Sequence, residues 1–318
     1  MPTTSRSTER VSGRLKLRSL RIVSAVAKWG SMAKAADHLA ISQPVVSKAI
    51  ADLEHTLGVR LFDRSAQGVE PTMYGRALVK CGVAVFDELR QGVRQLEFLA
   101  DPTAGELRIG SSEGMAVGFL SAVIERLYRQ YPRVVLHVTQ TDTSTLQYGE
   151  LRERNVELVL GRLTTATGDD DLDTEVLFDD QLYVVAGLES RWARRRLIKL
   201  ADLVHEPWVL PPSDSKIGPL TAELFRASGL EVPHASVITF SIHLRNSLLA
   251  TGRFLTLLPG SMLRFGAKRL SFKVLPVELP AQPSPVGIVT LKNRTLSPVA
   301  QLFVDCARAT AKPIAKVR

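Results

Sequence analysis

The segment from Ser42 to Lys48, Ser-Gln-Pro-Val-Val-Ser-Lys, carries the side chains of this chain that are best suited to contact nucleic acid. The amide of Gln43 can pair with both hydrogen-bonding groups of an adenine edge, and the hydroxyls of Ser42 and Ser47 can reach a base or a phosphate. Lys48 can bind a phosphate oxygen. The alternative interpretation is an ordinary helix face exposed to water.

Helical signals surround this segment. A first helix is predicted from Leu17 to Trp29 with Gly30 as its stop, and Ser31 is expected to cap a second helix that ends near Leu39. Ser42 is expected to cap a third helix with Pro44 in its first turn. Apolar residues of the third helix share one stripe, which leaves Pro44, Ser47 and Lys48 on the opposite face. Two short helices in this order predict a helix-turn-helix that reads the major groove of DNA.

A small hairpin is predicted to follow, with strands over residues 58–64 and 69–71 joined by a turn over residues 65–68. Arg60 and Arg64 of this hairpin can contact the DNA backbone, which adds affinity without reading the sequence.

The charge of the chain is concentrated near its N-terminus. Of 318 residues, 45% are hydrophobic and the net charge is +9. Residues 1–80 contain 13 Lys and Arg against 6 Asp and Glu, whereas the remainder contains 28 against 26. We therefore expect nucleic acid as the partner of the first quarter, and small molecules or protein as partners of the rest.

Several features predict a cytoplasmic location and no membrane contact. Residues 1–14 are expected to form a flexible basic arm, because no apolar stretch follows their positive charges as it would in a signal peptide. No apolar run approaches the roughly 20 residues that span a bilayer. Cys81 and Cys306 have no metal-binding or CxxC spacing, which is typical of a reducing compartment. Residues 311–318 are expected to be a basic tail.

A set of residues at fixed spacing runs through the first quarter of the chain: Ala35-Ala36, Leu39, Ser42-Gln43-Pro44, Val46-Ser47, Ile50, Leu53-Glu54, Leu57-Gly58, Leu61-Phe62, Arg64, Thr72 and Gly75. With these residues, residues 15–72 resemble the DNA-binding domain of LysR-type transcriptional regulators. The resemblance implies a winged helix-turn-helix with Ser42, Gln43, Pro44, Ser47 and Lys48 on its recognition helix, and Ser31, Arg60 and Arg64 complete the expected DNA-binding set. The chain departs from the family pattern at Met32, Gln67 and Glu70-Pro71.

A long helix is predicted over residues 73–100, with Thr72 as its cap. Its apolar residues follow heptads, although Gly82 and Gly92 interrupt the seam and soften the helix. The family resemblance implies that this helix pairs two chains, so we expect a homodimer or homotetramer. A twofold protein places two recognition helices on an inverted-repeat site in double-stranded promoter DNA.

Strands and helices alternate after the break at residues 101–105, which predicts an α/β domain over residues 105–310. The order resembles the periplasmic-binding-protein-like, two-lobed effector domain of the same family. We expect lobe I to contain residues 105–164 and 267–310, and lobe II residues 165–266. The fold class is thus α/β with an α-rich N-terminal part.

Ligands of open α/β sheets bind at the carboxyl ends of strands, where helix N-termini present free N–H groups. This places the expected effector site at Ser111, Ser112, Glu113, Arg162, Ser241 and His243. These groups suit a sugar, an organic acid or a sulfonate, and the alternative for each is a helix cap or a surface ion pair. Residues 253–259 and 290–298 resemble the branch of the family that contains galactose-binding-protein regulators.

The sequence contains no HExxH, P-loop or glycine-rich dinucleotide motif, and its six histidines lack metal-ligand spacing. We therefore expect no catalytic residues, no metal and no cofactor. The interpretation is a DNA-binding regulator controlled by a small molecule, with RNA polymerase as a further partner. The alternative is a metabolite-binding module that binds no specific DNA.

Overall fold

The computed structural model describes residues 15–65, 68–141, 144–163, 170–215, 217–266, 272–280 and 284–315. The chain divides into two compact units, one ending at Gly92 and the other beginning at Val93. The expected arm over residues 1–14, the end of the basic tail and the atypical Gln67 lie outside the described residues.

Three helices build the first unit: α2 (Leu17–Trp29), α3 (Met32–Leu39) and α4 (Gln43–Leu57). Their apolar stripes meet in a core that includes Val23, Ala35 and Ile50, each fully buried. The turn between α3 and α4 passes through Ala40, whose φ of 54° is unusual for a residue with a side chain. The helix-turn-helix predicted from the sequence is therefore present.

A two-stranded hairpin follows α4, formed by β1 (Phe62–Ser65) and β2 (Gly68–Pro71). The first strand begins later than the predicted residue 58, because Gly58 adopts a φ of 69° and ends α4 there. The carboxylate of Glu54 then accepts hydrogen bonds from the backbone N–H groups of Leu61, at 2.7 Å, and Phe62, at 3.2 Å. These hydrogen bonds fix the start of the hairpin to α4.

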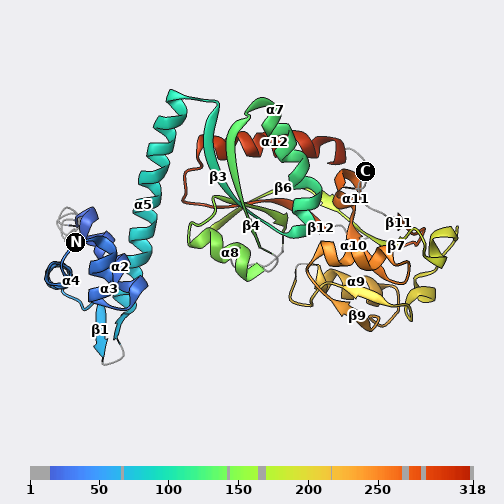
Figure 1. Ribbon diagram of the computed structural model, residues 1–318, viewed down its shortest axis with the longest axis horizontal. Helices are drawn as coiled ribbons and strands as arrows, with labels where there is room; N and C mark the ends of the chain where they lie inside the picture. The colour runs from blue at the N-terminus through green and yellow to red at the C-terminus, as the bar shows by residue number, and fades with distance from the viewer. Residues whose placement is uncertain are drawn as a thin grey trace, which may run out of the picture. The chain divides into compact units, whose positions relative to one another are not determined.

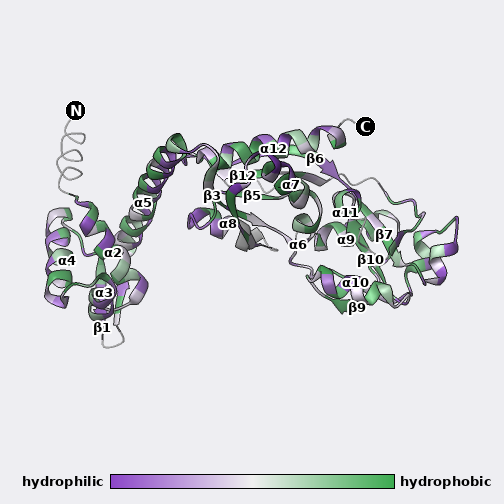
Figure 2. Ribbon diagram, turned by 45° about the horizontal axis from the view of Figure 1, so that its top comes forward, coloured by the Kyte–Doolittle hydropathy of each residue, from purple (hydrophilic) through white to green (hydrophobic). Residues whose placement is uncertain are grey.

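The long helix α5 covers Met73–Ala100, as predicted. Its start is held by Thr72, whose hydroxyl donates to the carbonyl of Arg60 at 2.7 Å and accepts from the N–H of Gly75 at 3.1 Å. Hydrophobic and hydrophilic residues alternate along the helix (Figure 2). Gly82 is buried, and a Cβ there would lie 3.3 Å from the hydroxyl of Ser24, so this glycine allows α2 and α5 to pack closely.

The first lobe of the second unit is a five-stranded sheet in the order β4-β3-β5-β12-β6. Strands β3, β4 and β5 are parallel, whereas β12 runs antiparallel to both of its neighbours, so the sheet is mixed rather than mostly parallel. The strands are β3 (Ala104–Ser111), β4 (Arg133–Gln140), β5 (Leu158–Arg162), β6 (Leu172–Asp180) and β12 (Ser284–Leu291).

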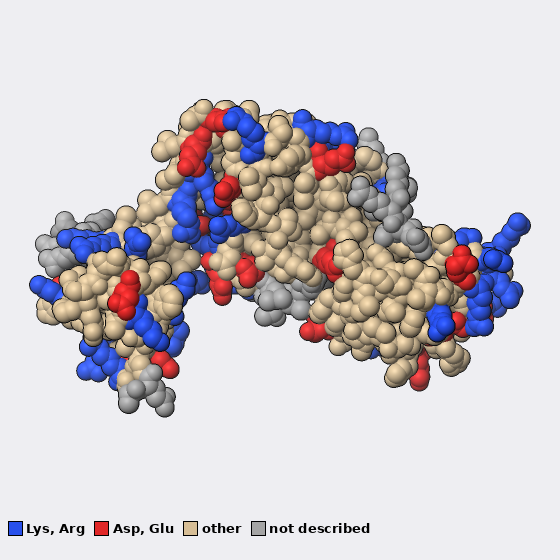
Figure 3. Space-filling view, in the orientation of Figure 1, with Lys and Arg blue, Asp and Glu red and all other residues tan. Residues whose placement is uncertain are grey.

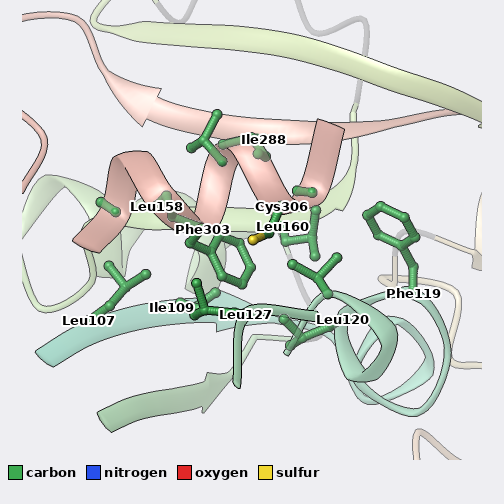
Figure 4. Packing of buried hydrophobic residues seen from close by; sticks show 14 of the residues in the cluster. Leu107, Ile109, Phe119, Leu120, Leu127, Leu158, Leu160, Ile288, Phe303 and Cys306 are labelled. Atoms are coloured by element: carbon green, nitrogen blue, oxygen red, sulfur yellow. The ribbon is translucent and has the colours of Figure 1, made fainter. Parts of the chain in front are cut away.

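Helices cover both faces of this sheet (Figure 1). On one face, α7 (Ser121–Gln130) and α12 (Pro298–Ala315) pack together over a core that includes Leu127 and Phe303 (Figure 4). Cys306 lies in the same core, and burial raises the pKa of its thiol. On the other face, α8 (Ser144–Arg152) contributes Leu151.

The helical segment that follows β3 is broken at its start. A short helix α6 (Glu113–Met115) continues as a π-helical turn, η1 (Ala116–Leu120), before α7 begins. Gly118 lies within this turn, and a Cβ there would come within 2.9 Å of the Cα of Met262 in helix α11 (Gly260–Gly266). The local distortion therefore coincides with a close approach of two backbones.

The second lobe is also a five-stranded sheet, in the order β11-β7-β10-β8-β9. Helix α9 (Gly218–Ala227) and the short helices η2 (Arg191–Arg194) and η3 (Leu200–Leu203) accompany it, and α10 (Ile242–Ala250) packs through Ile242 and Leu249. The strands are β7 (Leu182–Gly187), β8 (Trp208–Leu210), β9 (Ala235–Ile238), β10 (Leu255–Pro259) and β11 (Phe272–Val274).

The chain crosses between the two lobes at positions that differ from the expected boundaries of 165 and 267. Strand β6 pairs with β12 in the first lobe, so the chain crosses to the second lobe at about Asp180. Strand β11 pairs with β7, so the return crossing follows Val274. The sequence pattern does not predict β6, and it does not identify the neighbour of the edge strand β11, which explains the two differences.

None of the described helices is long and apolar enough to cross a membrane.

Candidate functional site

The polar segment at residues 42–48 lies at the start of α4 in the first unit. Gln43, Pro44 and Lys48 are exposed, and Ser47 is partly exposed. The opposite side of the helix is held in the core by Val46 and Ile50. The helix therefore presents a narrow polar front to water, with an amide and an amine available for base and phosphate contacts.

The two predicted helix caps differ in their contacts. The hydroxyl of Ser31 accepts a hydrogen bond from the N–H of Lys34 at 3.4 Å, as expected for a cap. Ser42 occupies the cap position of α4, but its side chain makes no capping hydrogen bond. The hydroxyl of Ser42 is exposed and is left available to another partner.

The hairpin brings two further cations to the surface of the same unit. Arg60 precedes β1, and Arg64 lies within it; both side chains are exposed. Their backbone is fixed by the contacts of Glu54 and Thr72 described above. Arg60 and Arg64 thus occupy an anchored hairpin rather than a free loop.

A cavity lies between the two lobes of the second unit, at the carboxyl ends of strands from both sheets. The first lobe supplies Ser112, Met115 and Arg162, and the second supplies residues of the segments that follow β8 and β9 together with Pro259 at the end of β10. This is the position at which open α/β sheets bind ligands. The complete lining is Ser112, Gly114, Met115, Arg162, Pro211, Ser215, Ile217, Phe240, Ile242, Arg245 and Pro259.

The N-terminus of α10 is occupied by protein groups. Ser241 accepts a hydrogen bond from the N–H of Leu244 at 3.2 Å, and the carboxylate of Glu113 accepts one from the N–H of Ile242 at 2.8 Å. Glu113 belongs to the first lobe, so its carboxylate takes the place of an external anion at this helix. These N–H groups are not free, in contrast to the expectation from the sequence.

Arg162 lies at the cavity wall and is buried with Asp180, their charged groups 3.0 Å apart. Burial lowers the pKa of Arg162, and the neighbouring carboxylate partly offsets that effect. Asp180 also accepts hydrogen bonds from the backbone N–H of Ser261 at 3.0 Å and from its hydroxyl at 2.7 Å. The network thus joins the end of β5, the point near Asp180 where the chain first crosses between the lobes, and the start of α11.

Four of the predicted effector residues do not line the cavity: Ser111, Glu113, Ser241 and His243. Glu113 and Ser241 instead accept hydrogen bonds from N–H groups at the start of α10. Ser111 is buried in the sheet, where its hydroxyl donates to the carbonyl of Leu160 at 3.0 Å. His243 is exposed on α10 and lies outside the lining. In each case a neighbour one or two residues away faces the cavity instead, because side chains alternate along a strand and rotate around a helix.

Sequence reasoning missed Ser215, Phe240 and Arg245 as cavity residues. Arg245 is buried, and its guanidinium donates to the carbonyl of Thr239 at 3.0 Å. It lies four residues after Ser241, so the one-turn spacing of the helix was the available signal. Ser215 had no such signal, because its loop reaches the cavity only through the tertiary fold.

Comparison with known proteins follows the same division of the chain. The "LysR substrate binding domain" matches residues 100–312, which is more than half of the chain. The chain belongs to the LysR family. The "bacterial regulatory helix-turn-helix protein, lysR family" domain also matches this LysR-family chain, at residues 17–76.

Individual relatives agree with this assignment. The transcriptional regulator GbpR of Azospirillum brasilense is 28% identical over 302 residues, covering 95% of this chain and 88% of GbpR. A full-length OxyR variant from Pseudomonas aeruginosa has the same fold, with a TM-score of 0.66, 22% identity and coverage of 94% of this chain and 97% of OxyR. Full-length CbnR in complex with its target DNA is also similar in fold, with a TM-score of 0.55, 22% identity and coverage of 93% and 100%.

The LysR-family regulator is therefore a DNA-binding protein with an effector-binding domain, and it is not an enzyme. The predicted fold class is confirmed: an N-terminal helix-turn-helix, a long helix and a two-lobed α/β domain. The identity to GbpR supports the family and not a particular branch of it.

Proposed function

We propose that this LysR-family chain binds an inverted-repeat site in promoter DNA and changes its DNA contacts when a small organic anion enters the cavity between its lobes. The observation that carries the effector class is the lining of that cavity, where two arginines, Arg162 and Arg245, occur without an acidic residue among the described lining; Arg162 is also paired with Asp180, which is not part of that lining. Guanidinium groups in a buried wall favour a carboxylate or sulfonate.

An organic acid fits the remaining lining better than a sugar does. A sugar needs several open hydrogen-bonding partners, but the hydroxyl of Ser215 already donates to the carbonyl of Pro212 at 2.7 Å. The hydroxyl of Ser112 makes no hydrogen bond with the described residues, which leaves it open to a ligand. Most other lining residues, including Met115 and Phe240, are apolar and suit the body of an aliphatic or aromatic acid.

Ligand entry requires the cavity to enlarge. Its volume is about 40 Å³, room for roughly three water molecules, and an organic acid has more non-hydrogen atoms than that. The lobes or their side chains must therefore move when the ligand binds. Such a ligand shifts the protein between two arrangements by its difference in affinity for them, and that difference is the signal that DNA binding can register.

Assembly and location complete the proposal. Pairing of two chains through α5 as a homodimer, or two pairs as a tetramer, places two α4 helices on one inverted repeat. The protein acts in the cytoplasm, where promoter DNA and RNA polymerase are available to it.

A thermal-shift screen of the full-length protein tests the effector class. The probes are monosaccharides, aliphatic and aromatic carboxylic acids, and sulfonates, each acid compared with its neutral amide or alcohol. We expect an acid to raise the melting temperature, by the equivalent of about 2.7 kcal/mol at a hundredfold excess over its Kd, while the neutral analogue does not.

Variants connect that shift to the cavity. Ser112→Phe places a large ring in the cavity wall and should abolish the shift, whereas His243→Ala changes an exposed residue outside it and should leave the shift intact. Stabilisation by sugars but by no acid would contradict the proposed class. DNA binding without sequence preference would instead support the alternative of a metabolite-binding module.

A further inference from the structure

An uninterrupted basic segment lies in the second lobe. Residues 191–199, with the sequence Arg-Trp-Ala-Arg-Arg-Arg-Leu-Ile-Lys, contain five cations and no acidic residue. The chain after residue 80 carries only two more basic than acidic residues in total, so this segment is a local exception. Basic side chains gather at one end of the second lobe (Figure 3).

The consecutive arginines of this segment keep their charges available. Arg191 forms an ion pair with Glu206 and lies over the ring of Trp192, 5.2 Å from its centre. In contrast, Arg194, Arg195 and Arg196 are exposed and make no ion pair or side-chain hydrogen bond with the part of the chain that the structure describes. We call these three residues the arginine ridge.

The backbone of the arginine ridge is anchored on both sides. Ala193 before it and Ile198 after it are buried, and Ile198 forms a parallel β-bridge with Val277. The ammonium group of Lys273 in β11 donates to the carbonyl of Ala193 at 2.5 Å. A ligand therefore has to order side chains only, since the backbone is already fixed.

We propose that the arginine ridge contacts the phosphate backbone of DNA that flanks the site held by α4. The inference rests on the proposed function, because specific binding by the first unit brings the flanking DNA to the same molecule. Tethering gives a second contact a high effective concentration, so even a weak basic patch engages a polyanion that is already bound. Arginine forks also match phosphate oxygens in geometry.

An acidic protein segment is the competing occupant. Leu197 is 82% exposed beside the arginine ridge and offers an apolar contact that DNA does not use. A single exposed leucine is nevertheless ordinary on a protein surface. An acidic protein would also have to supply its full affinity unaided, whereas flanking DNA is already tethered, and this favours DNA.

The test uses full-length protein and two DNA duplexes. A binding site is first selected from a random duplex library with the unaltered protein; it is then prepared alone and with about three helical turns of DNA on each side. We expect the flanks to raise affinity roughly tenfold at low salt and to steepen the salt dependence by about 0.9 for each added phosphate contact.

The variant Arg194→Ser/Arg195→Ser/Arg196→Ser should bind the short duplex as the unaltered protein does and lose the gain from the flanks. The matched control removes the same charge from exposed positions elsewhere in the second unit, with Arg126→Ser, Arg129→Ser and Arg226→Ser. This control variant should keep the increase in affinity that the flanking DNA provides.

Each other result has a definite meaning. Equal affinity of the unaltered protein for both duplexes, or an equal gain in the ridge variant, overturns the proposal; the first result leaves an acidic protein as the occupant. If no preferred sequence can be selected, the proposed function fails independently. The same proteins are then compared on random duplex DNA, where an unchanged salt dependence of the ridge variant overturns the ridge contact.

Discussion

Gln43 and Lys48 are both exposed on α4, but their side chains suit different parts of DNA. Gln43→Ala should relax the preference for one base pair, because a bidentate contact to adenine contributes about 1–3 kcal/mol of discrimination. Lys48→Ala should weaken binding to all DNA sequences alike. It should also lower the slope of log affinity against log salt concentration by about 0.9. Fluorescence anisotropy on the selected site and its single-base variants measures both effects. A uniform loss for Gln43→Ala would remove it from base reading.

The residues of α4 could be predicted from the sequence because they are contiguous and follow one helical period. The effector cavity could be predicted only in part. Ser112 and Arg162 were identified by their position at strand ends, and both line the cavity. Ser215 could not be assigned, because its loop reaches the cavity only after folding, whereas the one-turn spacing from Ser241 was a signal for Arg245.

Two glycines of α5, Gly75 and Gly92, differ in the space around them. A Cβ at Gly75 would lie 2.0 Å from the carbonyl oxygen of Leu61, whereas at Gly92 it would meet nothing within 4 Å. Gly75→Ala should therefore destabilise the first unit by roughly 1–3 kcal/mol through overpacking. Gly92→Ala should stabilise the helix by about 1 kcal/mol. Chemical denaturation followed by circular dichroism measures both, and equal effects would contradict this distinction.

Helical and strand periodicity predicted most elements, with boundaries within a few residues. Two features escaped it for physical reasons. The π-helical turn at Gly118 accompanies a close backbone contact with Met262, which no local pattern encodes. The sequence pattern does not predict β6, and the partner of β11 depends on pairing between distant segments, so both strands lie in the range expected for the other lobe.

At the scale of the whole molecule, the exposed apolar residues of α5 predict its assembly. Leu89 and Leu96 are 48% and 69% exposed and lie on one side of the helix, two turns apart. Leu89→Asp/Leu96→Asp should convert a dimer to a monomer, because it places two charges in the expected seam. Multi-angle light scattering measures the mass, and Gln95→Asp, at another exposed position of α5, is the control. A dimer that survives the double substitution would locate the contact elsewhere.

Strand β12 has a consequence for how the protein is made. It lies between β5 and β6, so the first lobe lacks an interior strand until residues 284–291 have been synthesised. The strands of the second lobe, residues 182–274, all leave the ribosome earlier. The lobe that begins first in the sequence is therefore completed last, and during synthesis β5 and β6 both present an unpaired edge to the surrounding solution.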